Sequence, residues 1–167
     1  MTEVTVRTLR LQDVPALAAL VHDNLDHIAR FIRASQAPTR DVLNSLTSAY
    51  LATDQGRRWD GVIEGDGRLV GRLRVLPIEG REWDLEGEVV IWVAEDACGC
   101  GVGTRALSAL CDQWANRLWA RVDESNTASV RIFESNDFER VSEGPFEKAG
   151  PHQIFFQKDL DPPARQE

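Results

Sequence analysis

The stretch of sequence that decides the fold is Cys98-Gly99-Cys100-Gly101-Val102-Gly103-Thr104, in which three glycines alternate with other residues. It follows a short apolar run, VVIWV at 89–93, that is typical of a buried strand. It precedes apolar residues that recur at helical spacing, namely Leu107, Leu110, Cys111 and Trp114. Glycines between a strand and a helix let the backbone approach a ligand, and the helix start offers unpaired N–H groups. This pattern favours a diphosphate-binding loop, although taken alone it also fits a loose turn.

Two common nucleotide-binding motifs do not fit this loop. A Walker-type loop needs Lys followed by Ser or Thr after the last glycine, and the chain has Thr104 and Arg105 there. The dinucleotide fingerprint G-x-G-x-x-G would need glycine at 104 or 106, and these positions are Thr104 and Ala106. The spacing instead matches a G-x-G that enters a helix directly.

The flanking sequence resembles the GNAT superfamily of acyl-CoA N-acyltransferases over about 50 residues, from Glu88 to Phe138. That family carries Arg/Gln-x-x-Gly-x-Gly/Ala at a helix start, and residues 98–103 match it with Cys98 at the Arg/Gln position. It then carries Asn-x-x-Ser/Ala, an amphipathic helix and Gly-Phe, which residues 126–138 resemble. The order of these features is most similar to the RimJ/RimL branch, which acetylates protein N-termini and various small amines.

The element order predicts an α/β fold, a single GNAT-like domain over 1–160 followed by a flexible tail over 161–167. Alternating or continuous apolar runs predict strands at 4–9, 59–63, 69–75, 88–93, 118–122, 138–142 and 154–158. Helical spacing and capping residues predict helices that start after Asp13, at Asp26–Ile32, after Thr39, from the glycine loop to about Asn116, and at Ser129–Ser135. We therefore expect a mixed central sheet of about six or seven strands flanked by helices.

Composition narrows the class of protein. The chain has 167 residues, a net charge of −8 and no apolar stretch near the roughly 20 residues that a membrane span needs. It begins without a signal pattern, so we expect a cytoplasmic protein that binds no membrane. No basic stripe appears, so we expect no nucleic-acid partner, and an acidic surface suits a cationic amine.

The cysteines and histidines do not have the spacing of a metal site. Cys98 and Cys100 form C-x-C without a second Cys or His pair, so we expect no metal. The helix start is a place where the thiols of Cys98 or Cys100 could be activated as thiolates. Cys111, on the helix, is expected in the core.

The resemblance implies acetyl-CoA as co-substrate, an amine as acceptor and a possible homodimer. In the family, the fourth and fifth strands splay apart and the pantetheine arm of the cofactor enters the gap. The expected cofactor-binding residues are Trp92, Val93, Ala94, Cys98, Gly99, Cys100, Gly101, Val102, Gly103, Thr104, Asn126, Ser129 and Phe133. Asn126 could equally be only a helix cap.

Acyl transfer to an amine requires a group that takes the amine proton and, in many enzymes, a group that protonates the leaving thiolate. Glu88 is the candidate base and Glu86 its alternative, and a close pair of these carboxylates could raise a pKa. Ser129 is the candidate acid, by resemblance to RimL-type enzymes. Each could instead be an ordinary solvated or helix-start residue. Phe133 stands where many family members have the acidic tyrosine, and Arg121 where some have a base glutamate.

The acceptor pocket is expected from the second helical region and from one loop. The resemblance places Ile28, Phe31 and Ile32 on the acceptor wall, and Trp83 with Glu86 lies in a polar loop that could line the same pocket. These features predict an acetyl-CoA-dependent N-acetyltransferase that transfers the acetyl group directly. Phe133 and Arg121 leave a second hypothesis open, a non-catalytic acyl-CoA-binding sensor or regulatory module.

Overall fold

The computed structural model describes residues 3–30, 41–83, 85–146, 150 and 152–161. The predicted acceptor residues Phe31 and Ile32, the expected cap at Thr39 and the tail beyond 161 lie outside the described residues. Within the described part of the chain, no helix is long and apolar enough to cross a membrane.

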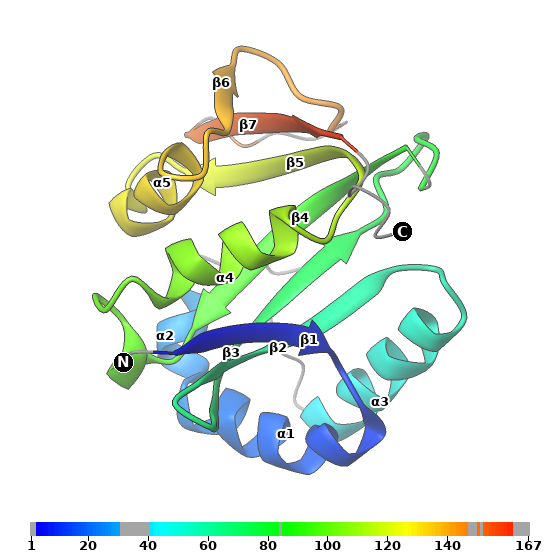
Figure 1. The fold of residues 1–167 in the computed structure, drawn as a ribbon, viewed down its shortest axis with the longest axis vertical. Helices are drawn as coiled ribbons and strands as arrows, with labels where there is room; N and C mark the ends of the chain where they lie inside the picture. Colours follow the sequence, from blue (N-terminus) through cyan, green and yellow to red (C-terminus); the bar gives the residue numbers. More distant parts are fainter. Residues whose placement is uncertain (1–2, 31–40, 84, 147–149, 151, 162–167) are drawn as a thin grey trace, which may run out of the picture.

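Seven strands form one mixed sheet in the order β1-β2-β3-β4-β5-β7-β6, which confirms the predicted fold class (Figure 1). The strands are β1 Val4–Thr8, β2 Trp59–Gly65, β3 Arg68–Leu76, β4 Glu86–Val93, β5 Asn116–Asp123, β6 Glu139–Val141 and β7 Gln153–Leu160. Neighbouring strands are antiparallel except β4 and β5, which are parallel.

Helices cover both faces of this sheet. They are α1 Val14–Asp23, α2 Leu25–Ala29, α3 Val42–Asp54, α4 Val102–Cys111 and α5 Thr127–Glu134, with 3₁₀ turns η1 Leu11–Asp13 and η2 Glu95–Ala97. In Figure 1, α4 lies across the middle of the view, between β1 and β5, whereas α1 and α3 lie along its lower side.

Two hydrophobic clusters follow from the period-two alternation of the strands. On β4, Val89 and Val93 belong to the cluster under α4 and α5, whereas Trp92 belongs to the cluster under α1 and α3. Glu88 lies four residues before Trp92 on β4, so the two side chains point to the same face of the sheet. Its side chain therefore lies on the face of the sheet that α1, α2 and α3 cover.

The parallel pair β4–β5 is joined at one end only. Its paired positions are Glu86–Arg117, Gly87–Leu118 and Glu88–Trp119, although β4 continues to Val93 and β5 to Asp123. The two strands therefore diverge toward their carboxyl ends, as the resemblance implied. The divergence leaves backbone of β4 without a neighbouring strand on that side, next to the glycine loop.

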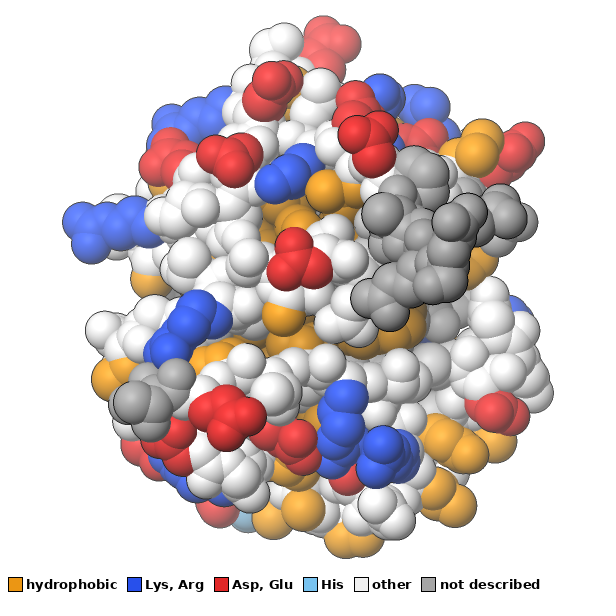
Figure 2. Space-filling view, viewed as in Figure 1, with side chains coloured by type: hydrophobic (Ala, Val, Ile, Leu, Met, Phe, Trp, Pro, Cys, Tyr) orange, Lys and Arg blue, Asp and Glu red, His pale blue; other side chains and the backbone are white. Residues whose placement is uncertain are grey.

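Positive and negative side chains are interspersed over the surface shown in Figure 2.

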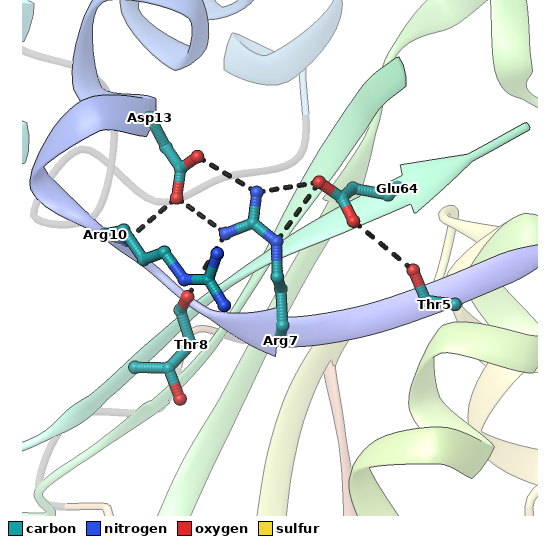
Figure 3. Close-up of polar contacts among 6 residues, drawn as sticks. All are labelled: Thr5, Arg7, Thr8, Arg10, Asp13 and Glu64. Atoms are coloured by element: carbon teal, nitrogen blue, oxygen red, sulfur yellow. Dashed lines mark hydrogen bonds and ion pairs between the residues drawn. The ribbon is translucent and has the colours of Figure 1, made fainter. Parts of the chain in front are cut away.

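A network of hydrogen bonds links the start of α1 to the sheet. Arg7 donates two hydrogen bonds to Asp13, at 2.7 and 2.9 Å, and two to Glu64, at 3.1 and 2.7 Å (Figure 3). Asp13 also accepts from the backbone N–H of Arg10 at 2.8 Å. Arg7 holds the pKa of the buried Asp13 carboxyl below its ordinary value. The start of α1, on the Glu88 face, is thus tied to β1 and β2.

Helix α4 ends earlier than the sequence predicts. The helix after the glycine loop ends at Cys111, five residues before the predicted Asn116, and Asn116 instead begins β5. Asn116 has a φ of 75°, a left-handed conformation that asparagine tolerates better than most residues and that a helix interior does not accept. The apolar Trp114 belongs to the turn and packs against Trp59 and Trp83.

Candidate active site

A cavity of about 140 Å³ lies beside the carboxyl-terminal part of β4, beyond the last residue that pairs with β5, and between α2 and the start of α5. Three residues of β4, two of α2, four of α5 or its cap and one of the loop line it, namely Ile91, Trp92, Val93, His27, Ile28, Asn126, Ala128, Ser129, Ile132 and Cys98. The mostly apolar walls and small volume suit a slender chain rather than a whole nucleotide. The structure thus brings predicted residues from four separate segments to one place.

The glycine loop has the backbone geometry of an anion cradle. Gly99 and Gly101 adopt φ values of 76° and 72°, which L side chains rarely accept. α4 begins at Val102 with Gly101 as its N-cap, so the N–H groups of its first turn lack intrahelical acceptors. None of the residues that the structure describes lies within 4 Å of a Cβ added at either Gly99 or Gly101, so these residues leave room for a ligand at the loop. These features fit the diphosphate of a CoA thioester.

Three of the predicted loop and strand residues also have a role in the protein's own structure. Val102 is buried in the core, and a Cβ added at Gly103 would lie 2.5 Å from the Ile132 side chain, so these residues let α4 approach α5. The N–H of Ala94 donates to Val70 at 2.7 Å and is therefore not available to a ligand. The predicted cofactor contacts of Val102 and Gly103 are therefore limited to their backbone N–H groups in the first turn of α4, and the predicted pairing of the Ala94 N–H with the cofactor is not supported.

Asn126 and Ser129 begin α5 beside the cavity. The Asn126 side-chain oxygen accepts a hydrogen bond from the Ser129 N–H at 3.1 Å, so Asn126 caps the helix as the alternative interpretation held. Both residues also line the cavity. The cap therefore fixes the half-buried Ser129 hydroxyl at the cavity wall. Neighbouring Thr104 is only half-buried, and its carbonyl accepts from Asn136 at 3.2 Å.

Phe133 does not reach the cavity. It is 2% exposed and packs against Phe138 and Phe156, with ring centroids 5.1 and 5.5 Å apart. The predicted contact of Phe133 with the cofactor is not supported, because its ring packs in the core and does not line the cavity.

Cys98 is held as a thiol rather than activated. Burial raises its pKa, and the carboxylates of Glu95 and Asp96 raise it further. Its sulfur lies 3.6 Å from Nε2 of His27 and 3.7 Å from the Val93 carbonyl oxygen. Helix α4 begins four residues later, so the predicted activation of Cys98 by a helix start is wrong.

Glu88 lies at the closed end of the β4–β5 gap, at the last paired position. Its two carboxylate oxygens accept hydrogen bonds from Nε and Nη2 of Arg121 at 2.9 and 2.8 Å. Both side chains are buried, and the Arg121 guanidinium lies 3.9 Å from the ring centroid of Phe146. The candidate base is therefore held in one orientation by a bidentate ion pair.

Glu86 and Trp83, which were predicted to lie near the acceptor, make other contacts in the structure. Glu86 accepts from Nε1 of Trp119 at 2.6 Å and from Arg81 at 3.4 Å, whereas Glu88 is bound by its own arginine. The two carboxylates thus have separate partners, and the predicted mutual coupling is not supported. Trp83 packs with the cluster under α4 and α5, on the opposite face from Glu88, so its prediction as an acceptor-pocket residue is wrong.

The Glu88 face also carries a group of charged side chains that was not predicted from the sequence. Asp60 on β2 accepts from Arg72 on β3 through both oxygens, each at 2.7 Å, and also from Arg58. Arg74 is buried beside them, and its pKa is lowered to about 9, chiefly by burial and then by the charge of Arg72. The signal in the sequence is the alternation of arginines with apolar residues over 72–75, which places both on one face.

No group of three or more His, Cys, Asp or Glu side chains among the described residues could hold a metal ion. The site is therefore built from the glycine loop, the cavity and the Glu88–Arg121 pair.

Sequence comparison now identifies the family. Residues 3–139 match the profile described as Acetyltransferase (GNAT) domain. The chain belongs to the GNAT acetyltransferase family. Its members use acetyl-CoA as co-substrate, and this chain is accordingly an acyltransferase that takes acetyl-CoA. Comparison with curated protein sequences gives no match.

Solved structures agree with this assignment at the level of the fold. RimL, a ribosomal L7/L12 α-N-protein acetyltransferase in complex with coenzyme A, superposes with a TM-score of 0.80 at 19% identity, over 96% of each chain. The microcin C7 self-immunity acetyltransferase MccE, in complex with acetyl-CoA and AMP, gives 0.79 at 13% identity, over 96% of this GNAT chain and 94% of MccE. A ribosomal-protein-alanine N-acetyltransferase from Brucella melitensis gives 0.70 at 25% identity, over 93% and 99%.

Proposed function

We propose that this GNAT protein transfers an acetyl group from acetyl-CoA directly to a primary amine, on a small molecule or a protein N-terminus, within a ternary complex. One observation carries the proposal. The cavity lies against Ile91, Trp92 and Val93 of β4, beyond Glu88 at the last β4–β5 pair, so the thioester end of a ligand threaded from the glycine loop would point toward a buried carboxylate.

In the proposed reaction, separate residues bind the cofactor, exclude water and transfer protons. The cradle at Gly99 and Gly101 binds the diphosphate, and the cavity between β4 and α5 excludes water from the slender arm. Glu88 takes the proton from the amine as its nitrogen bonds to the carbonyl carbon, directly or through one water. As the C–S bond breaks, the Ser129 hydroxyl donates a hydrogen bond to the leaving thiolate and passes to it a proton drawn from water, so that no serine alkoxide remains. The proton taken up by Glu88 returns to solvent after transfer, which leaves the amide and free CoA thiol.

Arg121 acts in this scheme as a positioning residue. The Arg121 guanidinium donates one hydrogen bond to each carboxylate oxygen of Glu88 and so fixes the orientation of the carboxylate. Each oxygen keeps a second lone pair that can accept a hydrogen bond from the amine or from a water. Stacking on Phe146 holds the guanidinium in place.

Cys98 and His27 both line the cavity, with the sulfur 3.6 Å from Nε2 of the imidazole. Burial and the charges of Glu95 and Asp96 raise the pKa of the Cys98 thiol, which disfavours the thiolate that a covalent intermediate would need and supports direct transfer.

The second candidate is a non-catalytic acyl-CoA-binding module. The bidentate hold of Arg121 on Glu88 favours it, since a carboxylate that serves a structural ion pair need not be a base. Release of free CoA thiol in the presence of amines and N-terminal peptides distinguishes the two. The transferase releases thiol with an acceptor, whereas the binding module binds acetyl-CoA and releases none.

A further inference from the structure

The ion pair of Glu88 and Arg121 is covered by an aromatic ring from the connection between β6 and β7. The centroid of the Phe146 ring lies 3.9 Å from the central carbon of the Arg121 guanidinium, so the ring faces the cation at stacking distance. The side chains of Arg121 and Glu88 are 9% and 8% exposed. Phe146 is therefore part of the cover that keeps water from this pair.

The Phe146 ring is itself held by two other rings. It makes an edge-to-face contact with Trp119, with centroids 6.4 Å apart, and stacks on Phe155 at 5.9 Å. Trp119 is paired with Glu88 across β4 and β5. Phe155 is paired with Arg121 across β5 and β7, so these four side chains lie on one face of the sheet. Phe146 packs on this face, over the side chains that flank the ion pair.

The backbone at Gly144 lies against the same rings. A Cβ added at Gly144 would lie 2.9 Å from Cδ2 of Phe146 and 2.9 Å from Cδ1 of Phe155, which is closer than real Cβ atoms approach other atoms. The absence of a side chain at Gly144 therefore allows the connection to pass close to both rings. A larger residue there would displace the Phe146 ring from its place.

Contact with the ring restrains the guanidinium in two ways. The negative face of the ring attracts the cation, most strongly where water is excluded. The ring also fills space into which the long arginine side chain would otherwise rotate, and so reduces the number of its rotamers. Because Arg121 donates to both oxygens of Glu88, a guanidinium held in one orientation holds the carboxylate in one orientation as well.

We propose that Phe146 is a positioning residue for acetyl transfer, which acts on the base Glu88 through Arg121. The proposal rests on the proposed function, since it takes Glu88 as the group that accepts the amine proton. Among the described residues, those that line the cavity do not include Phe146. The connection between β6 and β7 thus affects the chemical step through this ring and leaves acetyl-CoA binding unchanged.

Substitutions at Phe146 separate the face of the ring from its apolar bulk. We expect Phe146→Leu to lower kcat about 10- to 100-fold, as a small misplacement of a base does, while the acetyl-CoA Kd stays within about twofold. Phe146→Tyr keeps the ring and should retain kcat within about threefold of wild type. Gly144→Ala displaces the ring without removing it and should also lower kcat. Tyr50→Leu, which removes a half-buried ring on α3, is the matched control and should leave kcat unchanged.

The same substitution in the Glu88→Gln background shows whether Phe146 acts through the base. We expect Phe146→Leu to lower the residual rate of Glu88→Gln by less than about twofold, because the carboxylate that it positions is gone. An equal fall in both backgrounds would overturn the proposal, as would a kcat of Phe146→Leu equal to that of wild type. A raised acetyl-CoA Kd with unchanged kcat would contradict it as well, since Phe146 would then serve cofactor binding.

If the wild-type protein releases no thiol with any acceptor, the proposed function fails, and denaturant unfolding tests the contact by itself. A double-mutant cycle gives the coupling between Glu88 and Arg121. This coupling should be smaller in the Phe146→Leu background than in the wild-type background. Equal coupling in the two backgrounds would show that the ring does not position the pair.

Discussion

Glu88 and Arg121 face each other across β4 and β5 at the point where the two strands part, joined by two hydrogen bonds of 2.9 and 2.8 Å. Removing one partner from a buried pair leaves the other charge without compensation. The same contact therefore holds the strand gap together at its closed end and orients the proposed base. These two contributions can be separated by substitution.

Replacing the base alone tests its chemical role. We expect Glu88→Gln to lower kcat by about 10²-fold or more, because the amide cannot accept the amine proton. The acetyl-CoA Kd should stay within about twofold, since the cradle and cavity do not depend on this carboxylate. Thiol release and calorimetric titration measure the two quantities. Turnover equal to wild type would exclude Glu88 as the base, and Glu95→Gln, in the exposed η2 turn, controls for loss of a carboxylate nearby.

Replacing the arginine tests the structural role. Arg121→Met leaves the buried Glu88 carboxylate without its ion-pair partner and should reduce the free energy of unfolding by about 3–5 kcal/mol. The double variant Glu88→Gln with Arg121→Met should recover most of that loss, because no unpaired charge remains. Denaturant unfolding of the four proteins gives the coupling. Additive effects of the two substitutions would show that the pair contributes no coupling energy.

The role of Asn126 as a helix cap and its role in ligand binding can be separated by a substitution that retains a capping oxygen and removes the side-chain amide. Asn126→Ser retains a capping oxygen, so we expect the free energy of unfolding to change by less than about 0.5 kcal/mol. Loss of the amide at the cavity wall should raise the acetyl-CoA Kd about 5- to 10-fold, or about 1–1.4 kcal/mol. An unchanged Kd would mean that Asn126 serves the helix alone.

Ser129→Ala removes the proposed acid without removing the backbone N–H that the cap uses. We expect kcat to fall by about 10²-fold with acetyl-CoA binding retained. Ser108→Ala, on the exposed side of α4, is the matched control and should behave as wild type. If Ser129→Ala turned over at the control's rate, the thiolate would leave without help from this hydroxyl.

The network at Arg7 predicts the acid limit of stability. Hydrogen bonds from Arg7 lower the pKa of Asp13 below its ordinary value of 3.8, so this stabilisation is present above that value and is lost as the pH falls through the lowered pKa. Asp13→Asn should cost about 1.5–3 kcal/mol at pH 7, and the difference should shrink below about pH 4. Unfolding measured from pH 3 to 7 tests this, with the exposed Asp112→Asn as control. A difference that persists unchanged at pH 3 would contradict the assignment.

The parts of the fold that depend on local periodicity could be predicted from the sequence. The strand before the glycine loop, the loop itself and the cap at Asn126 follow from spacing and turn chemistry within about ten residues. The orientation of Phe133 and Trp83 could not be predicted, because it depends on which face of a helix or sheet meets the core. The contacts of Glu88 with Arg121 and of Cys98 with His27 join residues 33 and 71 positions apart, so only the folded chain shows them.

The most direct test of the account is titration of acetyl-CoA into the wild-type protein, followed in the same samples by thiol release over a panel of amines and N-terminal peptides. We predict saturable binding in the micromolar range and release of CoA thiol that depends on an added acceptor. Binding without release on any acceptor would contradict catalysis and favour the binding module. Failure to bind acetyl-CoA would show that the cradle with Cys98 and Cys100 does not hold a diphosphate, and the proposed function would fall with it.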